Sequence, residues 1–383
     1  MAAHSTILSQ LLKILPRHEF EAAARRHHRG RKLRSMTRWN QFLALLVGQL
    51  SGRSSLRDVV DNVNAQVRKL YHLGAQKIAR SSIARVNEQQ PASLFEELFH
   101  KLLARTQALS PGHRFRFKGR LISLDASLIE LTASLFPWAK YQKTKGAIKI
   151  HVGLDHAGYL PAFLTVTEGR KHEIPWARGL ELPAGSVVVF DRGFYDYQFF
   201  NQLNQKKIRF VTRLKRDIPF TVLERRRVRR GSGLTSDQTI RLTGQKALSY
   251  DLVLRRVGYR DPETCRHYYF LTNATDLAAS TIAEVYRERW QIELFFKWIK
   301  QNLRIKAFLG TSTNAVLSQL WVALCAYLLV AYTRFLSAAG WSIRQILRLL
   351  QLNLFEQRSL ADLFKPPELK PITPSPQLLL QIR

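Results

Sequence analysis

Three acidic residues are the first candidates for chemistry, because the pattern around each one predicts a largely buried position. Asp125 ends the apolar half of RLISLD, and Asp191 ends SVVVFD. Glu293 lies within YRERWQIELFFKWIK, residues 286–300, which contains neither Pro nor Gly and has the apolar spacing of a helix. A buried carboxylate is costly unless a cation meets it, so these three residues are candidate metal ligands.

The ligand types of this candidate site indicate which metal it would bind. Carboxylates without His or Cys favour a hard cation, Mg²⁺ or Mn²⁺, over zinc. Two such ions about 3.5–4 Å apart can activate a water or a 3′-hydroxyl and stabilise the departing oxygen of a phosphodiester. The expected cofactor is therefore Mg²⁺, bound as two ions, with Mn²⁺ as a substitute.

The helix predicted at 286–300 carries a polar stripe that spans about 80° of its helical wheel. The stripe consists of Tyr286, Arg289, Glu293, Lys297 and Lys300. Apolar side chains fill most of the other directions, which predicts a largely buried helix. Trp290 and Trp298 are accordingly expected to pack in the core, with base stacking as the alternative.

Each acidic residue also has an ordinary structural interpretation. An Asp at a strand end often caps a turn or pairs with Arg, and Asp191 is followed directly by Arg192. Glu293 has basic residues one helical turn away on both sides, an arrangement worth a few tenths of a kcal/mol. Other residues that could reach the site are Glu130, His151, Asp155 and Asp196. The coincidence of the three acidic positions with a strongly basic chain favours the metal site.

The chain is strongly basic, with 60 Lys and Arg against 28 Asp and Glu among 383 residues, a formal charge of +32. Residues 1–120 hold 22 basic and 7 acidic residues, a net of +15 (22 − 7), and a second basic cluster lies at 209–230. A charge run is usually a solvated face. An excess of this size over several segments instead indicates a polyanionic partner, most simply double-stranded DNA.

Nothing in the sequence indicates a membrane partner. The longest apolar run, Trp321–Tyr332, has 12 residues and suits a core helix rather than a bilayer span. The N-terminal stretch lacks the layout of a secretion signal. The two cysteines, Cys265 and Cys325, match no zinc or disulfide pattern and are expected to be buried thiols. These features predict a cytoplasmic protein.

The spacing of apolar residues divides the chain into segments of different secondary structure. Residues 1–112 predict helices, whereas 113–217 predict three strands, a short helix, a strand, a helix and a strand. Residues 218–278 predict a β-rich insertion, and 279–365 predict helices again. The Pro-containing segment 366–383 is an expected poorly ordered tail. The alternation of strands and helices indicates an α/β architecture with a partly parallel sheet.

The helical part at 1–112 combines short helices with many Arg residues, which favours a DNA-binding domain over a helical packing domain. Expected helix N-caps are Ser54 or Ser55 and Ser81 or Ser82.

Four residues of the helix at 286–300 complete a Tyr-x2-Arg-x3-Glu-x6-Lys signature. They are Tyr286, Arg289, Glu293 and Lys300. Together with LISLDAS around the first Asp, KIHVGLD on the next strand and VVVFDRGFYD around the second Asp, this signature resembles the DDE transposases of bacterial insertion sequences, in particular the insertion sequence 4 group. The likeness continues into FLGTSTNAVLSQLWVALCAYLL and reaches the N-terminal stretch, so it covers nearly the whole chain.

The resemblance implies a particular α/β fold. A ribonuclease H-like catalytic core would comprise 113–217 and 279–365, with the β-rich insertion at 218–278 between the second Asp and the Glu. An all-α DNA-binding domain at 1–112 would precede the core, and C-terminal helices would follow the catalytic Glu.

The resemblance also implies roles for individual residues. The catalytic, metal-binding residues would be Asp125, Asp191 and Glu293. The residues that hold DNA phosphates would be Tyr286, Arg289 and Lys300. Cations suit that stripe because the scissile region of DNA concentrates negative charge.

The expected function is transposition of an insertion sequence in a bacterial cytoplasm, where the protein associates with the nucleoid when bound to DNA. The enzyme would bind terminal inverted repeats, cleave the element ends and join the 3′-hydroxyls to target DNA. A homodimer is expected, because two ends must be brought together. One alternative is a catalytically inactive DNA-binding regulator derived from a transposase, and another is a standalone nuclease of the same fold.

Overall fold

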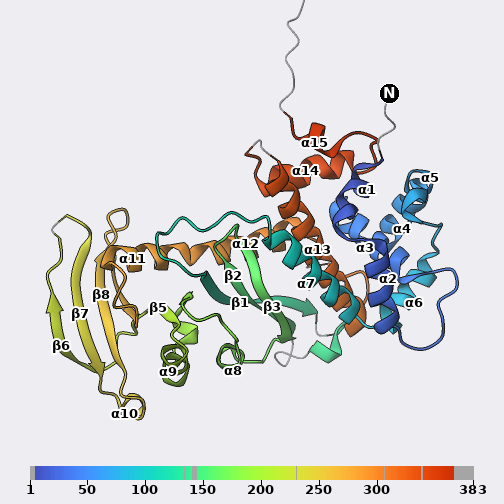
Figure 1. Cartoon of the computed structure of the whole chain (residues 1–383). Helices are drawn as coiled ribbons and strands as arrows, with labels where there is room; N and C mark the ends of the chain where they lie inside the picture. Colours follow the sequence, from blue (N-terminus) through green and yellow to red (C-terminus); the bar gives the residue numbers. More distant parts are fainter. Residues whose placement is uncertain are drawn as a thin grey trace, which may run out of the picture.

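The computed structural model describes residues 5–132, 134–139, 145–229, 231–305, 307–337 and 340–365 (Figure 1). The tail expected at 366–383 lies outside the described residues.

The N-terminal part is helical, as its apolar spacing predicts. Its α-helices are α1 (Ile7–Leu11), α2 (Arg17–Arg26), α3 (Arg38–Leu50), α4 (Leu56–Ala65), α5 (Val67–Leu70), α6 (Arg80–Gln89) and α7 (Ser93–Gln107). Short 3-10 turns follow α1 and α5.

One of the two predicted N-caps is confirmed. Ser55 caps α4, and its hydroxyl accepts a hydrogen bond at 3.1 Å from a backbone amide of the first turn. The other prediction is wrong, because α6 begins at Arg80 and both serines lie inside its first turn. The start of α6 is held instead by Asn64, whose side chain both donates to and accepts from the backbone of Ile78.

The strands of the structure form one mixed sheet. They are β1 (Leu121–Thr132), β2 (Lys145–Asp155), β3 (Leu160–Glu168), β4 (Val187–Phe190), β5 (Arg209–Arg213), β6 (Phe220–Arg226), β7 (Leu234–Leu242), β8 (Val253–Arg260) and β9 (His267–Thr272). Their order is β3-β2-β1-β4-β5-β9-β8-β7-β6. The β1–β4 and β4–β5 pairs are parallel and the others are antiparallel, which confirms the partly parallel α/β sheet.

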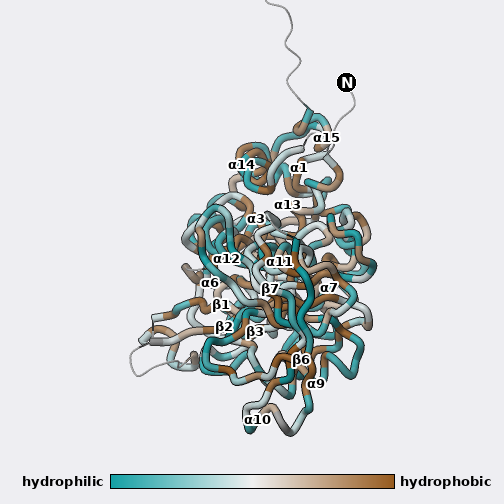
Figure 2. The backbone as a smooth tube through the Cα atoms, turned by 90° about the vertical axis from the view of Figure 1, so that its left-hand side faces the viewer, coloured by the Kyte–Doolittle hydropathy of each residue, from teal (hydrophilic) through white to brown (hydrophobic). Residues whose placement is uncertain are grey.

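The order of elements before the insertion also agrees with the sequence. A tight turn joins β2 to β3, α8 (Glu173–Arg178) precedes β4, and α9 (Tyr197–Gln205) precedes β5. The insertion is β-rich, but it is not a separate layer. Its last strand, β9, pairs with β5, so β6–β9 extend the central sheet. Figure 2 views the molecule from this side, with β6 in front.

Helices cover both faces of the central strands. On one face, apolar residues of β1 and β4 pack against α8 and α9. On the other face, β1, β4 and β5 pack against α11 (Ala279–Glu288), and β1 also contacts α12 (Trp290–Asn302). The helix expected as one piece at 286–300 is thus interrupted at Arg289, whose backbone angles stay helical, so α11 and α12 continue nearly in line (Figure 1).

The C-terminal helices join the N-terminal helices in one core. They are α13 (Thr313–Leu336), α14 (Ile343–Asn353) and α15 (Leu360–Leu363). α13 is long and apolar enough to cross a membrane, but 89% of its apolar stretch is buried inside the protein, as expected of a core helix. It packs against α3 and α7. Both views place α1, α14 and α15 at one end of the molecule and α9 and α10 (Gln245–Leu248) at the other (Figures 1 and 2).

The two cysteines differ in their surroundings. Cys325 is buried in α13, as predicted, and burial raises the pKa of its thiol. The prediction for Cys265 is wrong, because this residue is exposed. Cys265 has a φ angle of +54° before β9, so it lies in a turn rather than inside a strand.

Candidate active site

The sheet brings Asp125 and Asp191 to the same level and the same face. In the parallel β1–β4 pair, Leu124 lies opposite Phe190, and each aspartate is the next residue of its chain. Side chains alternate between the two faces of a strand. Asp125 therefore projects on the side opposite to Leu124, which packs toward α8 and α9. This is the side covered by α11 and α12.

The carboxyl of Asp125 interacts by charge with Asp191, Arg289 and Glu293. Burial raises the pKa of its carboxyl from the usual 3.8 to about 7, and the negative charges of Asp191 and Glu293 act in the same direction. A hydrogen bond from Ala126 N at 2.8 Å and the positive charge of Arg289 act against this rise. The charge interactions show that both other predicted acidic residues lie near Asp125.

Asp191 follows β4 and also serves as a cap. Its Oδ1 accepts a hydrogen bond from Gly193 N at 2.8 Å and starts a 3-10 turn. Arg192 does not neutralise it, because that guanidinium donates to Leu214 O at 3.1 Å. The turn-capping interpretation is thus correct, and among the described residues no side chain donates to the other carboxylate oxygen of Asp191.

Glu293 lies in the first turn of α12 and pairs with Arg289. The two side chains are 2.5 Å apart from Oε1 to the guanidinium, and they are 33% and 14% exposed, respectively. The hydrogen bond with Glu293 and the negative charge of Asp125 raise the pKa of Arg289 despite its burial. Its Nε is buried and has no hydrogen-bond partner among the described residues.

The other members of the polar stripe lie on both sides of this pair. Tyr286 is at the end of α11, where its ring contacts Phe270 with centroids 4.9 Å apart. Burial and the negative charge of Asp191 raise the pKa of its hydroxyl. Lys300 is in the last turn of α12.

The carboxylates fit a hard divalent cation by their donor set and by their charge. One oxygen of Asp125 and one of Asp191 each accept a hydrogen bond from a backbone amide, and Glu293 accepts one from Arg289. Among the described residues, no three Asp, Glu, His or Cys side chains already surround one point. Like charges repel one another, and a cation between these carboxylates would offset that repulsion.

Basic side chains that the sequence did not single out lie near Arg192, the residue after Asp191. The positive charges of Arg213 and Arg216, together with burial, lower the pKa of Arg192. Arg213 lies over the ring of Tyr268 at 4.8 Å, and its Nε is buried without a hydrogen-bond partner in the described part of the chain. The signal was available in the basic cluster at 209–230, but only the fold shows which of its members lie near Arg192.

The aromatic predictions for α12 are half correct. Trp298 is half-buried and packs against Tyr327, with ring centroids 5.2 Å apart. Trp290 is 57% exposed, so its expected place in the core is wrong. Together with exposed Leu294, it leaves one side of α12 open, and the helix is less buried than predicted.

His151 belongs to the opposite face of the sheet. It lies across from Ala126 on β1, so its side chain projects away from Asp125. It is buried, bonds Thr167 at 2.9 Å and packs on Trp176, and burial lowers its pKa to about 4. His151 therefore packs against Trp176 on the other face of the sheet and does not approach the candidate site.

The remaining carboxylates have other roles. Asp155 is paired with Arg120 and Asp196 with Arg178, both at 2.6 Å. Glu130 is exposed.

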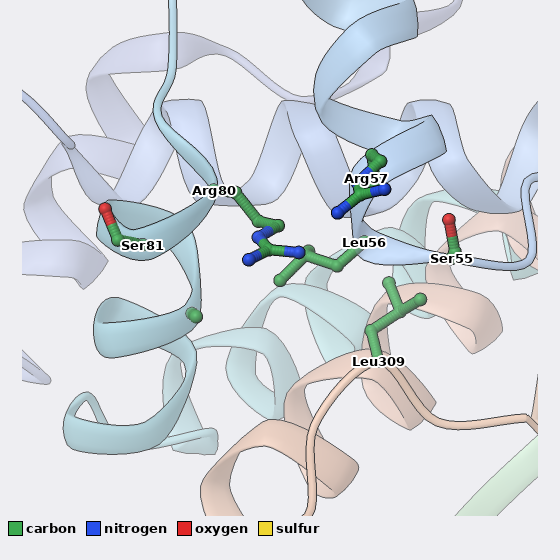
Figure 3. A pocket seen from close by; sticks show the side chains of 7 residues that line it. Ser55, Leu56, Arg57, Arg80, Ser81 and Leu309 are labelled. Atoms are coloured by element: carbon green, nitrogen blue, oxygen red, sulfur yellow. The ribbon is translucent and has the colours of Figure 1, made fainter.

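A separate cavity of about 620 Å³ lies in the helical part, where the starts of α4 and α6 meet the segment after α12. It is lined by Ser55, Leu56, Arg57, Arg80, Ser81, Ala84 and Leu309, none of which is acidic. Figure 3 shows the guanidinium groups of Arg57 and Arg80 extending into the same space. Two cations side by side repel each other unless an anion lies between them.

A mixed α/β sheet that carries acidic residues on one face, in a chain of charge +32, is typical of metal-dependent enzymes that act on nucleic acid. Residues 116–329 match the family described as the transposase DDE domain. The chain therefore belongs to the DDE transposases, and it is an enzyme of DNA transposition. Residues 3–76 match a family described as a domain of unknown function, DUF4372.

Relatives of known annotation agree with this assignment. A putative transposase of Sinorhizobium fredii is 32% identical over 295 residues, which cover 76% of this chain and 81% of the relative. A probable transposase for insertion sequence element IS5377 of Geobacillus stearothermophilus is 28% identical, over 70% of both chains. A putative transposase for insertion sequence element IS4SA of Synechocystis is 22% identical, over 79% of this chain and 86% of the relative.

Proposed function

We propose that this transposase is a member of the insertion sequence 4 group with a ribonuclease H-like core, and that Asp125, Asp191 and Glu293 form its catalytic centre. The observation that carries the proposal is the charge interaction of Asp125 with both other carboxylates on the α11–α12 face of the sheet. The order β3-β2-β1-β4-β5, with β2 antiparallel, supports the assignment of the core.

The carboxylates would hold two Mg²⁺ ions, which supply charge to activate the attacking oxygen and stabilise the leaving one. Asp125 would contribute from inside β1, Asp191 from the end of β4, and Glu293 from α12 after leaving Arg289. The free guanidinium of Arg289 then donates to a DNA phosphate, with its buried Nε already lacking a partner.

Tyr286 and Lys300 would contact further phosphates along the same stripe. Lys300 acts as a point charge, whereas Tyr286 donates a hydrogen bond from a hydroxyl whose raised pKa keeps it protonated. Arg192 and Arg213 extend this cationic surface past Asp191. Exposed Trp290, one position after Arg289, is placed to stack on an unpaired base.

A strand-transfer assay tests the proposed function. The purified protein is incubated with a duplex carrying the element end, supercoiled target plasmid and Mg²⁺. We expect covalent joining of the end to the plasmid. Cleavage without joining would indicate a standalone nuclease, and DNA binding without cleavage in Mg²⁺ and in Mn²⁺ would indicate a regulator.

The N-terminal helices would bind the terminal inverted repeats, with the cavity between α4 and α6 as a contact for the DNA backbone. From Glu293 to Asn302, α12 spans about 14 Å, and the chain then leads to Leu309 at the cavity. A duplex turn is about 34 Å long. We propose that one bound element end contacts both sites.

Removing the two arginines of the cavity is expected to reduce the salt dependence of binding to end DNA. In Arg57→Gln with Arg80→Gln, the slope of log affinity against log salt should become shallower by about 1.8, because each phosphate contact contributes about 0.9. Fluorescence anisotropy with a labelled end duplex measures the slope. The control is Arg344→Gln with Arg348→Gln, an equal charge change on exposed positions of α14. Equal slopes for the two variants would contradict this contact.

We further propose a homodimer that holds two element ends in the bacterial cytoplasm. The insertion would add DNA contacts, since Arg225, Arg227 and Arg229 are exposed at or just beyond the edge strand β6. A solvated edge that resists strand pairing is the other interpretation.

A further inference from the structure

The carboxylate of Glu288 is buried immediately before Arg289, outside the site described so far. Glu288 is 8% exposed. Its Oε1 lies 2.5 Å from the guanidinium of Arg114, while its Oε2 accepts a hydrogen bond from the Tyr159 hydroxyl at 3.3 Å and lies 3.7 Å from His156 Nδ1. His156 and Arg114 hold the pKa of Glu288 below its ordinary value, so the group is ionised at neutral pH.

The second nitrogen of His156 connects this carboxylate to the strand of Asp125. His156 Nε2 lies 2.7 Å from Ser123 Oγ, and both side chains are buried. Ser123 precedes Asp125 by two residues on β1, so the two side chains project from the same face. The 3.7 Å from Nδ1 to Glu288 Oε2 is too long for a hydrogen bond, and Nδ1 has no hydrogen-bond partner in the described part of the chain, so His156 contacts Glu288 without bonding it.

The turn that carries His156 is also fixed to α12. Tyr159 has a φ angle of +57°, a conformation that a residue other than Gly keeps only where its surroundings fix it. Its carbonyl oxygen accepts a hydrogen bond from Tyr327 at 3.0 Å. The ring of Tyr327 in turn packs against Phe295 and Trp298, each with centroids 5.2 Å apart.

We propose that Glu288 is a positioning residue for the catalytic centre. It is the last residue of α11, and only Arg289 separates it from the first residue of α12. Holding Glu288 with Arg114 and Tyr159 against His156, which bonds Ser123 of β1, sets the direction of α12, and so the position of Glu293 relative to Asp125. This inference rests on the proposed catalytic role of those two carboxylates.

Glu288→Ala is expected to slow cleavage of end DNA by about 10–100-fold, the usual effect of losing a group that orients metal ligands. The Mg²⁺ concentration for half-maximal cleavage should rise. Affinity for the same DNA in EDTA should stay within about twofold, because Glu288 does not face the DNA. Glu288→Gln should recover part of the rate, since its single amide oxygen can still accept from Arg114, whereas its amide nitrogen cannot accept from Tyr159.

Two further variants separate positioning from folding. Tyr159→Phe removes one hydroxyl and should slow cleavage by about fivefold, the effect of one hydrogen bond. Glu284→Ala, on the exposed side of α11, should behave as wild type. The inference is overturned if Glu288→Ala cleaves at the wild-type rate with an unchanged Mg²⁺ requirement. It is also overturned if Glu288→Ala loses DNA binding together with cleavage while Tyr159→Phe cleaves normally.

The variant Glu293→Gln distinguishes this inference from the proposed function. If Glu293→Gln is inactive and the Glu288 variants are normal, only the positioning role fails. If Glu293→Gln also cleaves normally, the catalytic assignment itself fails.

Discussion

Glu293→Gln is expected to slow cleavage at the element ends by about 10²- to 10³-fold. The substitution keeps the volume of the side chain but removes the charge that would bind a cation in the transition state, and loss of one such electrostatic group typically costs 10²- to 10³-fold, about 3–4 kcal/mol. Single-turnover cleavage of a labelled end duplex in Mg²⁺ measures the effect. Glu284→Gln is the matched control, because Glu284 is exposed on the preceding helix.

The same variant should bind end DNA at least as tightly as wild type when no metal is present. In wild type, Glu293 forms a salt bridge with the guanidinium of Arg289. A neutral glutamine would bind that guanidinium less strongly and leave it available for a phosphate. Filter binding in EDTA gives this readout. A variant with wild-type cleavage, or with weakened DNA binding and normal metal response, would contradict the assigned role of Glu293.

Asp125→Asn is expected to stabilise the metal-free protein at pH 8 while abolishing cleavage. The carboxyl of Asp125 titrates near 3.8 when unfolded and near 7 when folded, so the folded state holds its proton more tightly. The contribution of Asp125 to the free energy of unfolding is therefore fully present below about pH 4 and is lost as the pH rises through 7. The shift corresponds to at most about 4 kcal/mol, or roughly 3–5 °C in the unfolding midpoint for a chain of this size.

Thermal unfolding between pH 4 and pH 9 in EDTA tests this expectation. Wild type should lose stability across that interval more steeply than Asp125→Asn, and the two should converge near pH 4. Added Mn²⁺ should raise the midpoint of wild type at pH 8 but not that of the variant, because the ion binds the folded site alone. If the unfolding midpoints of the two proteins changed with pH in parallel, ionised Asp125 would not destabilise the folded state, and this expectation would be wrong.

Much of the site was predictable because it depends on local pattern. Asp191 directly follows β4, as expected, but the expectation that Asp125 ends its strand is wrong, because β1 continues to Thr132. The parallel pairing still brings the two aspartates together, because each follows the last paired residue, Leu124 in β1 and Phe190 in β4. The spacing from Tyr286 to Lys300 places these polar residues along one side of a helix. The stripe stays on one side despite the interruption at Arg289, because α11 and α12 continue nearly in line (Figure 1). The alternation of strands and helices likewise depends on periodicity within short windows.

The rest depends on contacts between distant segments. Nothing local distinguishes an apolar Trp290 that faces solvent from Trp298, which packs on α13. The pairing of β9 with β5 joins the insertion to the central sheet, although β6, β7 and β8 lie between them in the sequence. In the sequence, nothing distinguishes Glu288 from an ordinary helix residue. Its partners His156 and Arg114 lie more than a hundred residues away in the chain and contact it only in the folded structure.

Anomalous diffraction from Mn²⁺ in crystals of the protein with end DNA would locate the metal relative to the three carboxylates. We expect Mn²⁺ within about 2.2 Å of oxygens from Asp125, Asp191 and Glu293, with Arg289 turned from Glu293 to a phosphate. Manganese bound elsewhere, with the Glu293–Arg289 pair intact beside a bound DNA end, would contradict it.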